Sequence, residues 1–221
     1  MSGNHVARLR ALDVCDLSDA LDALGLPPAV TGLAPTSGVR PIAGRAVTVK
    51  LAAGRAPTGA GQHLCTAAVE MAGPDDVIVV EQRSGVDAAG WGGILSCAAK
   101  TRGIAGTLVD GPTRDVPEAV RHDYAVYARS VTARTARGRI HEAECQTAIR
   151  LGDTTVAPGD YIAADASGCV VIPAVEIEAV LANAEAIRDK GESMTAAVKA
   201  GRPVSEVMSR DYETMLERRS S

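Results

Sequence analysis

The sequence predicts an α/β domain built around a mixed sheet, and three observations predict this class. Short runs of Val, Ile and Leu alternate with segments of helical periodicity, which is typical of α/β folds. The run at residues 76–81 (DVIVVE) is apolar almost throughout, as strands covered on both faces are. From residue 174 onward the pattern becomes helical. The 221 residues suit one compact domain spanning residues 1–221, in which residues 191–221 form a helical tail that packs on the domain or on a neighbouring subunit.

Turn-forming residues divide the first half of the chain into alternating elements. Asp16 is positioned to cap a helix, and Gly25 stands where the left-handed residue that ends this helix is expected. The turn Gly73-Pro74-Asp75 leads into the apolar strand. In order, we expect a helix at residues 17–24, a loop at 27–45, a strand at 46–52, a loop at 54–61, a helix at 63–72 and a strand at 76–81.

The second half continues the alternation and ends in helices. The pair Gly92-Gly93 opens a helix that Gly103 ends, and another helix begins near Asp115. Ser167-Gly168 joins the last two strands. We expect strands at residues 106–110, 125–133, 159–165 and 169–172, and helical segments at 176–190, 193–201 and 204–216.

Composition excludes several classes of partner. The chain has a net charge of −4, one Trp, four Tyr and no Phe, so it offers neither a basic groove nor stacked aromatic rings to nucleic acid. No stretch approaches the roughly 20 apolar residues of a membrane span, and the N-terminus lacks the apolar run of a signal peptide. The five scattered Cys form no CxxC pair and are typical of reduced thiols. We therefore expect a cytoplasmic protein that binds neither nucleic acid nor membrane.

The first candidate binding motif is Gly92-Gly93-Ile94-Leu95. A glycine pair at a helix start lets a ligand approach the backbone closely, and the first N–H groups of a helix lack intrahelical partners. With the positive end of the helix dipole, these amides form a site for an anion such as a carboxylate. The alternative is that the glycine pair only turns the chain into the helix.

The second candidate motif is Arg114-Asp115 with Glu118 one turn later, just after the strand at residues 106–110. Ligand sites in open α/β sheets favour such strand ends. Arg114 offers a planar fork for a carboxylate or an enolate oxygen, Asp115 an oxygen ligand for a hard divalent cation, and Glu118 a partner for a metal-bound water. The alternative is that Asp115 caps the next helix, Glu118 completes a capping box, and Arg114 is a surface ion-pair partner.

The two motifs reinforce one another. One begins a helix and the other follows the next strand, so both are expected on the same rim of the sheet. Backbone amides and Arg114 would hold a carboxylate and a carbonyl, while a cation at Asp115 would polarise the carbonyl as a Lewis acid. Cleavage of a bond β to a ketone requires this arrangement, because the departing electrons come to rest on an enolate oxygen.

Gly93, twenty intervening residues, Arg114-Asp115, two more residues and Glu118 together resemble the signature of the HMG/CHA aldolase group of the RraA-like superfamily. These enzymes act on 4-hydroxy-4-methyl-2-oxoglutarate and 4-carboxy-4-hydroxy-2-oxoadipate. The resemblance runs from about Asp16 to Pro173. It also includes Asp19-Ala20-Leu21, residues 43–49 and 103–110, Pro158-Gly159-Asp160, Asp165 and Val170-Val171-Ile172-Pro173.

The resemblance implies a layered αββα fold and a class II pyruvate aldolase that works without a Schiff-base lysine. It implies that the Gly92-Gly93-Ile94-Leu95 loop binds the pyruvate carboxylate through its amides, and that Arg114 contacts the pyruvyl group and stabilises the enolate. It implies that Asp115 binds Mg²⁺ or Mn²⁺ largely through water, with Glu118 in the outer shell. It also implies decarboxylation of oxaloacetate, since that reaction passes through the same enolate.

The resemblance further implies a homo-oligomer, a trimer or hexamer with sites at subunit boundaries. An acidic residue of the neighbouring subunit then completes the outer shell of the metal. Three residues are open candidates for this position: Glu176, Glu178 and Glu185.

Several other residues have two interpretations each. His63 is a site acid, base or substrate contact, or else a helix-start or interface residue. Asp110 supports its loop or joins the outer metal shell, and Trp91 walls the pocket or anchors an interface.

Nothing singles out Lys100 for a Schiff base, so a solvated helix charge is expected. The basic residues Arg134, Arg137 and Arg139 bind an anionic ligand or form a solvated face, and Cys65 and Cys97 are expected to pack in the core.

Two other functions are compatible with the sequence. The superfamily includes non-enzymatic regulators that bind an RNA-degrading endonuclease, although the intact set of Arg114, Asp115 and Glu118 favours an enzyme. A lyase for a different 2-oxo or 3-hydroxy acid is the other, because loops and a second subunit would form the far side of the pocket. A methyltransferase is rejected, since the chain lacks the Gly-rich strand–loop–helix arrangement typical of S-adenosylmethionine binding.

Overall fold

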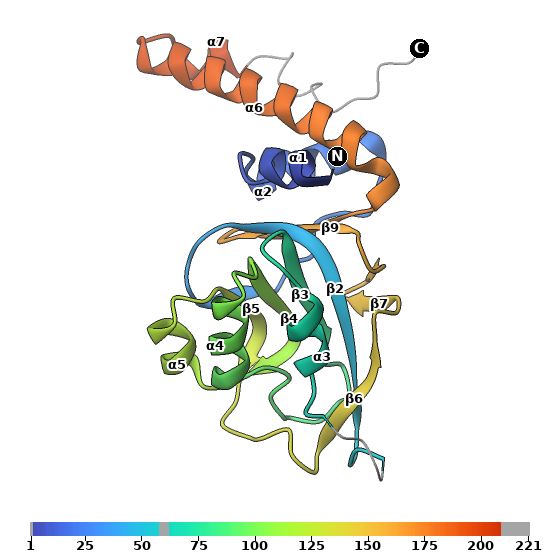
Figure 1. The fold of residues 1–221 in the computed structure, drawn as a ribbon. Coiled ribbons are helices and arrows are strands. Elements are labelled where there is room, and N and C mark those ends of the chain that lie inside the picture. Colours follow the sequence, from blue (N-terminus) through green and yellow to red (C-terminus); the bar gives the residue numbers. More distant parts are fainter. Residues whose placement is uncertain (1, 58–61, 209–221) are drawn as a thin grey trace.

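The computed structural model describes residues 2–57 and 62–208 (Figure 1). The helices are α1 (Ser2–Leu9), α2 (Val14–Leu24), α3 (Thr66–Met71), α4 (Gly93–Thr101), α5 (Val116–Arg121), the 3₁₀ turn η1 (Ala174–Glu176), α6 (Ile177–Lys199) and α7 (Val204–Val207). The strands are β1 (Ala34–Ser37), β2 (Ile42–Ala53), β3 (Asp76–Glu81), β4 (Gly106–Thr113), β5 (Val126–Val131), β6 (Ile140–Cys145), β7 (Ile149–Leu151), β8 (Thr154–Val156), β9 (Tyr161–Asp165) and β10 (Gly168–Ile172).

One curled, mixed sheet organises the molecule. Its strand order is β1-β5-β4-β3-β2-β9-β10, and β6 also pairs with β2. Strands β2, β3, β4 and β5 are parallel to one another, whereas β1, β6, β9 and β10 pair antiparallel. The twelve-residue β2 pairs with β9 along residues 42–45 and with β6 along residues 49–53, so it runs the height of the sheet (Figure 1). The predicted mixed sheet is confirmed.

The curl produces four layers in the order αββα. Helices α3, α4 and α5 cover one face of the parallel strands with an aliphatic core (Figure 1). On the other face, residues such as Val79 and Leu108 pack against Ile162 and Val171 of β9 and β10. Helices α1, α2 and α6 then cover the outer face of β9 and β10. Alternate residues of β9 and β10 therefore serve two different cores, as strands buried on both faces require.

The observed bounds differ from the predicted ones at several elements. The cap residue of α2 is Asp13 and not Asp16, whereas Gly25 takes the predicted left-handed conformation with a φ of 65°. The loop predicted at residues 27–45 contains β1 and the start of β2. The helix predicted from residue 63 begins at Thr66. Helix α1 and strands β6, β7 and β8 have no counterpart among the predicted elements.

The C-terminal part is one long helix where two segments were predicted. Helix α6 continues through Gly191 for 23 residues. Its first half packs against α1, α2, β9 and β10 and buries Ile177, Val180, Leu181 and Ala184. Its second half projects beyond the sheet (Figure 1). Of the third predicted segment, α7 is the described part, and residues 209–216 lie outside the described residues. No helix within residues 2–57 and 62–208 is long and apolar enough to cross a membrane.

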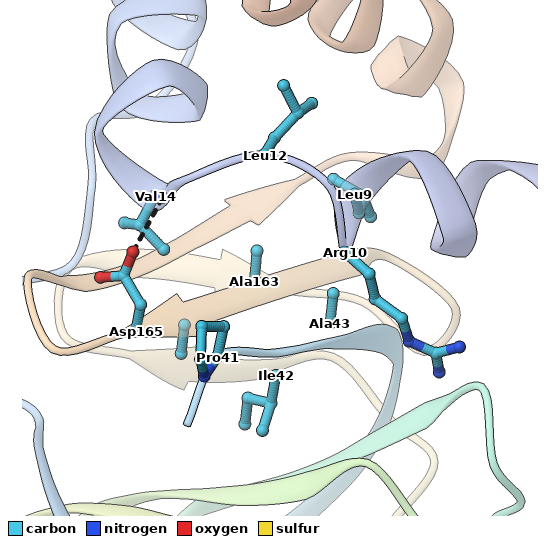
Figure 2. Close-up of a pocket in the computed structure, with 10 residues that line it drawn as sticks. Leu9, Arg10, Leu12, Val14, Pro41, Ile42, Ala43, Ala163 and Asp165 are labelled. Carbon is cyan, nitrogen blue, oxygen red and sulfur yellow. Dashed lines mark hydrogen bonds between the residues drawn. The ribbon is translucent and has the colours of Figure 1, made fainter. Parts of the chain in front are cut away.

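A small cavity lies where the α1–α2 connection passes over the start of β2 and the end of β9 (Figure 2). The Asp165 carboxylate at the end of β9 accepts a hydrogen bond of 3.0 Å from the N–H of Val14 at the start of α2 (Figure 2). The cavity volume of about 30 Å³ is enough for about one water molecule. This contact anchors the N-terminal helices to the sheet, and the cavity is too small for a substrate.

Candidate active site

A larger, open pocket of about 460 Å³ lies at the carboxyl ends of the parallel strands β3 and β4. It brings together every residue that the sequence analysis places in the site: Gly92, Gly93, Ile94, Leu95, Arg114, Asp115 and Glu118. The pocket also includes His63, Thr66, Thr135 and Arg137. The two predicted motifs therefore share one rim, as parallel neighbouring strands require.

Three hydrogen bonds join the two motif-bearing segments. Gly90 N–H donates to the carbonyl of Pro112 at 2.9 Å, and Arg114 N–H donates to the carbonyl of Trp91 at 3.0 Å. The Thr113 hydroxyl donates to the same Trp91 carbonyl at 3.2 Å. Two of these bonds join backbone to backbone and the third comes from a buried side chain, so the segment before α4 and the segment before α5 are held together as one unit.

Asp115 takes a backbone conformation that non-glycine residues rarely adopt. Its φ is 58°, and it stands in the cap position of α5 without a side-chain hydrogen bond to that helix. Its carboxylate instead accepts hydrogen bonds from Gly93 N–H at 3.2 Å and from Arg114 Nε at 3.1 Å. The capping-box alternative is therefore wrong, and the backbone strain directs the carboxylate into the pocket.

Glycine at position 93 is required by the close approach of α5. A Cβ atom there would lie 1.8 Å from Glu118 Oε2 and 2.8 Å from Glu118 Cβ. At position 92 a Cβ would lie 3.0 Å from Asp115 Oδ2. The glycine pair therefore does more than turn the chain, because it lets both carboxylates lie directly against the first turn of α4.

The first turn of α4 offers backbone donors to the pocket. The first intrahelical bond is from Ser96 N–H to the Gly92 carbonyl, at 3.0 Å. Among the described residues, the N–H groups of Ile94 and Leu95 have no hydrogen-bond partner. These two amides lie at the positive end of the helix, where an anion is stabilised.

Two carboxylates of the pocket are the residues that could hold a divalent cation. Asp115 and Glu118 are the carboxylates that line the pocket. Across residues 2–57 and 62–208, no group of three or more His, Cys, Asp or Glu side chains is placed to enclose a metal ion. Proteins commonly bind Mg²⁺ through one or two carboxylates while several waters remain. This donor set suits such a cation and does not suit a closed structural zinc site.

A family model described as RraA-like (Aldolase/RraA) matches residues 14–171. The chain belongs to the RraA-like family. A protein of Halalkalibacterium halodurans named "Putative 4-hydroxy-4-methyl-2-oxoglutarate aldolase" is 31% identical over 187 residues, which cover 82% of each chain. Protein DlpA of Legionella pneumophila is 29% identical over 198 residues, which cover 90% of this chain and 32% of DlpA. The chain thus spans about a third of the length of DlpA.

Solved structures share the RraA-like architecture. An uncharacterized protein from Pseudomonas syringae pv. tomato matches with a TM-score of 0.82 and 27% identity, covering 95% of this chain and 98% of its own. RraAS2 of Streptomyces coelicolor, described as an unusual member of the RNase ES inhibitor RraA protein family, matches with a TM-score of 0.77 and 23% identity, covering 87% and 96%. The RraA-like fold predicted from the sequence is confirmed.

The remaining wall of this RraA-like pocket carries positive charge. Desolvation and the nearby positive charge of Arg137 lower the pKa of His63, because both favour the neutral imidazole. Of the three arginines considered as a ligand site, only Arg137 lines the pocket. Arg134 pairs with Asp87 at 3.4 Å, and Arg139 donates to the carbonyl of Thr135 at 3.3 Å.

Two of the open interpretations are decided by contacts outside the pocket. Lys100, in the last turn of α4, is partly exposed, and its ammonium forms an ion pair of 2.8 Å with the Asp123 carboxylate, so it is an ion-paired surface charge and not a fully solvated one. Asp110 is buried and accepts hydrogen bonds from Arg129 Nε at 2.7 Å and from Gly152 N–H at 2.8 Å. It therefore holds Arg129 of β5 and the turn between β7 and β8, and not its own loop, and it is not among the described residues that line the pocket.

Trp91 and Cys65 lie beneath the pocket. The Trp91 side chain is 1% exposed and stacks on Tyr124, so it forms a floor and is not an interface anchor of this chain. Burial raises the pKa of the Cys65 thiol well above its usual range, in keeping with the predicted packing role.

Two of the acidic residues considered for a neighbouring site pair within this chain. Glu185 binds Arg8 at 2.7 Å, and Glu178 binds Arg8 at 2.8 Å and His5 at 2.7 Å. These contacts fasten α1 to α6. Glu176 lies in η1.

Two buried polar residues beside the site, Gln82 and Ser96, were not predicted from the sequence. The Gln82 amide donates to the carbonyls of Val86 and Ala88 at 3.1 and 2.7 Å, and its side chain fills the space next to Gly90. The Ser96 hydroxyl accepts a hydrogen bond from the Trp91 indole and donates one to the Gly92 carbonyl. A lone polar residue in or after an apolar run is the only sequence signal for either, since their partners are set by the fold.

Proposed function

We propose that this RraA-like protein is a divalent-metal-dependent lyase that cleaves a carbon–carbon bond in a small 2-oxo acid and releases pyruvate. The observation that carries the proposal is the convergence, in one pocket, of two unpaired amides, the Arg114 guanidinium and the Asp115 carboxylate. The name of the Halalkalibacterium halodurans relative supports 4-hydroxy-4-methyl-2-oxoglutarate as the substrate type. We include decarboxylation of oxaloacetate as a side activity.

The amides and Arg114 bind and orient the substrate. The carboxylate next to the ketone accepts hydrogen bonds from Ile94 and Leu95 N–H at the positive end of α4. Arg114 extends from the adjacent turn, and its fork suits the ketone oxygen and one carboxylate oxygen. Its Nε bonds Asp115, which fixes the direction of the guanidinium.

Bond cleavage leaves its electron pair on the pyruvyl fragment. The bond between C3 and C4 breaks, the electrons pass through C3 to the C2 oxygen as an enolate, and Arg114 stabilises this oxyanion. The C4 hydroxyl loses its proton as C4 becomes a ketone, and C3 takes up a proton to give pyruvate. With 4-hydroxy-4-methyl-2-oxoglutarate both products are pyruvate, and with oxaloacetate the leaving group is CO₂.

Asp115 and Glu118 would hold the Mg²⁺ or Mn²⁺ ion. Asp115 presents the more rigid carboxylate, because backbone strain and two hydrogen bonds fix it, while Glu118 lies over Gly93. When bound, the cation would act as a Lewis acid on the ketone and balance the charge that develops there.

We further propose that the protein is a homotrimer or homohexamer whose sites lie at subunit boundaries. Ile94 supports this, because its side chain is 81% exposed at the mouth of the pocket. An exposed aliphatic residue beside polar site groups is typical of an association surface.

The test is pyruvate release by chelator-stripped protein after addition of Mg²⁺ or Mn²⁺, from oxaloacetate and from 4-hydroxy-4-methyl-2-oxoglutarate. Arg114→Ala and Asp115→Ala should lose metal-dependent release, whereas Thr101→Ala at the other end of α4 should retain it. Release from oxaloacetate alone would keep the mechanism and change the substrate. No release above the metal-only background would refute the lyase proposal and make a protein-binding regulator the leading alternative.

A further inference from the structure

A short chain of side-chain hydrogen bonds lies directly beneath the proposed carboxylate site. The Trp91 indole Nε1–H donates to Ser96 Oγ at 2.9 Å, and the Ser96 hydroxyl donates to the Gly92 carbonyl at 3.1 Å. Trp91 is 1% exposed and Ser96 fully buried. This series of hydrogen bonds therefore ends on the carbonyl of Gly92, the residue that precedes the first turn of α4.

The same tryptophan also holds the second motif. Its carbonyl accepts the Arg114 N–H and the Thr113 hydroxyl, while its ring stacks on Tyr124 at 6.3 Å between centroids. Tyr124 is itself buried and shares a hydrogen bond of 2.9 Å with Thr107. Trp91 thus contacts the amide-bearing turn through its side chain and the arginine-bearing turn through its main chain.

The Ser96 bond differs from an ordinary helical serine bond. Ser and Thr hydroxyls often donate to the carbonyl four residues earlier, and Thr101 does so to Cys97 on the same helix at 2.9 Å. Thr101 is exposed and receives no donor in return. Ser96 in addition accepts the buried indole N–H, which would have no partner without it, and an unpaired buried donor is costly.

We propose that Ser96 and Trp91 are positioning residues for substrate binding. The Ser96 hydroxyl fixes the Gly92 peptide and with it the direction in which the Ile94 and Leu95 amides face the substrate carboxylate. Through Trp91 this geometry is tied to Arg114, so that both groups are oriented before the substrate arrives. This inference rests on the proposed function, because it assigns the amides a carboxylate ligand.

The experiment uses the single tryptophan of the chain as a reporter. In a protein labelled with ¹⁵N, the indole N–H of Trp91 gives one cross-peak, which is followed in the free protein and during titration with pyruvate in the presence of Mg²⁺. Ser96→Ala removes the acceptor, Ser96→Cys keeps the size with a weaker acceptor, and Thr101→Ala is the matched control. KM and kcat for oxaloacetate are measured for the same proteins.

In the free protein, Ser96→Ala should move the indole peak to the position of a weaker hydrogen bond and speed its exchange with solvent, with Ser96→Cys intermediate and Thr101→Ala unchanged. Pyruvate should shift the peak of the wild-type protein. Ser96→Ala should raise KM for oxaloacetate about five- to tenfold, the loss expected for about one hydrogen bond, and should change kcat less because ground and transition states share this contact.

The experiment distinguishes failure of the positioning role from failure of the proposed lyase function. If the wild-type protein binds pyruvate and Ser96→Ala changes neither the indole peak nor KM beyond the Thr101→Ala control, the positioning role is refuted and the lyase proposal stands. If the wild-type protein neither binds pyruvate nor releases it from oxaloacetate, the proposed function fails and this inference fails with it.

Discussion

Replacing Gly93 with Ala would place a methyl group in space that Glu118 occupies. The added Cβ would lie 1.8 Å from Glu118 Oε2, 2.7 Å from its Cδ and 2.8 Å from its Cβ. The carboxylate end can swing away, but the Cβ of Glu118 is fixed to the backbone of α5. The substitution therefore forces α4 and α5 apart at the point where the proposed substrate amides and metal carboxylates meet.

The magnitude follows from these distances. Overpacking by one methyl group typically destabilises a protein by about 1–3 kcal/mol, and here the shift of a helix places the expected cost in the upper half of that range. Gly191→Ala is the control, because that glycine lies within α6 with nothing near its missing Cβ. It should stabilise the protein by up to about 1 kcal/mol, as alanine does in exposed helices.

Urea unfolding of Gly93→Ala, Glu118→Gly and the double variant measures the clash as a coupling energy. Removing the Glu118 side chain should recover about 1–2 kcal/mol of the Gly93→Ala loss. Glu118→Ala should recover less, because it keeps the Cβ that lies at 2.8 Å. Strict additivity of the two substitutions would refute the contact between α4 and α5 on which the site geometry depends.

Three further outcomes are expected. Asp110→Asn removes the charge of a buried carboxylate that accepts two hydrogen bonds, and it should lower the free energy of unfolding by about 1–3 kcal/mol in urea titrations. No loss of stability would contradict the anchoring role of Asp110. The hydrogen bond from Arg8 lowers the pKa of Glu185 below its ordinary 4.5, so this pair stabilises the fold above that pH and is lost as the pH falls through the lowered value; Glu185→Gln should make the acid side of the stability–pH curve less steep, and an unchanged slope would contradict the pairing. Arg137→Gln should raise the pKa of His63 part of the way to its ordinary 6.5, since desolvation, the larger cause, remains; an NMR titration of the imidazole that shows no rise would place Arg137 away from it.

The site could be predicted to a large extent because its signals are local. A glycine pair at a helix start and an Arg-Asp pair at a strand end each have a physical reason to occur, and parallel strands bring them to one rim. The contact that makes Gly93 obligatory could not be predicted, because it depends on the spacing between two helices. The left-handed conformation of Asp115 could not be predicted either, because the sequence around it fits an ordinary helix cap equally well.

The missed elements are short, polar or both. Strand β6 (IHEAEC) is largely solvated and is held by pairing with the distant β2, and β7 and β8 have three residues each. Strand β1 (APTS) lies in a stretch whose Pro and Gly content predicts a loop. Such strands form because the rest of the sheet offers them an edge, so a single sequence carries little signal for them. The apolar strand β3, in contrast, has the bounds predicted for it.

The most direct test of the central claim is the exchange of the pyruvate methyl protons with solvent in D₂O, followed by ¹H NMR with metal-restored protein. Pyruvate is the common product of all the proposed reactions, so the measurement does not depend on knowing the natural substrate. We predict metal-dependent exchange that Arg114→Ala and Asp115→Ala abolish and Thr101→Ala retains, because proton loss at C3 requires the enolate to form in this pocket. Exchange no faster than with the metal alone, or exchange that both site variants retain, would contradict the proposed chemistry.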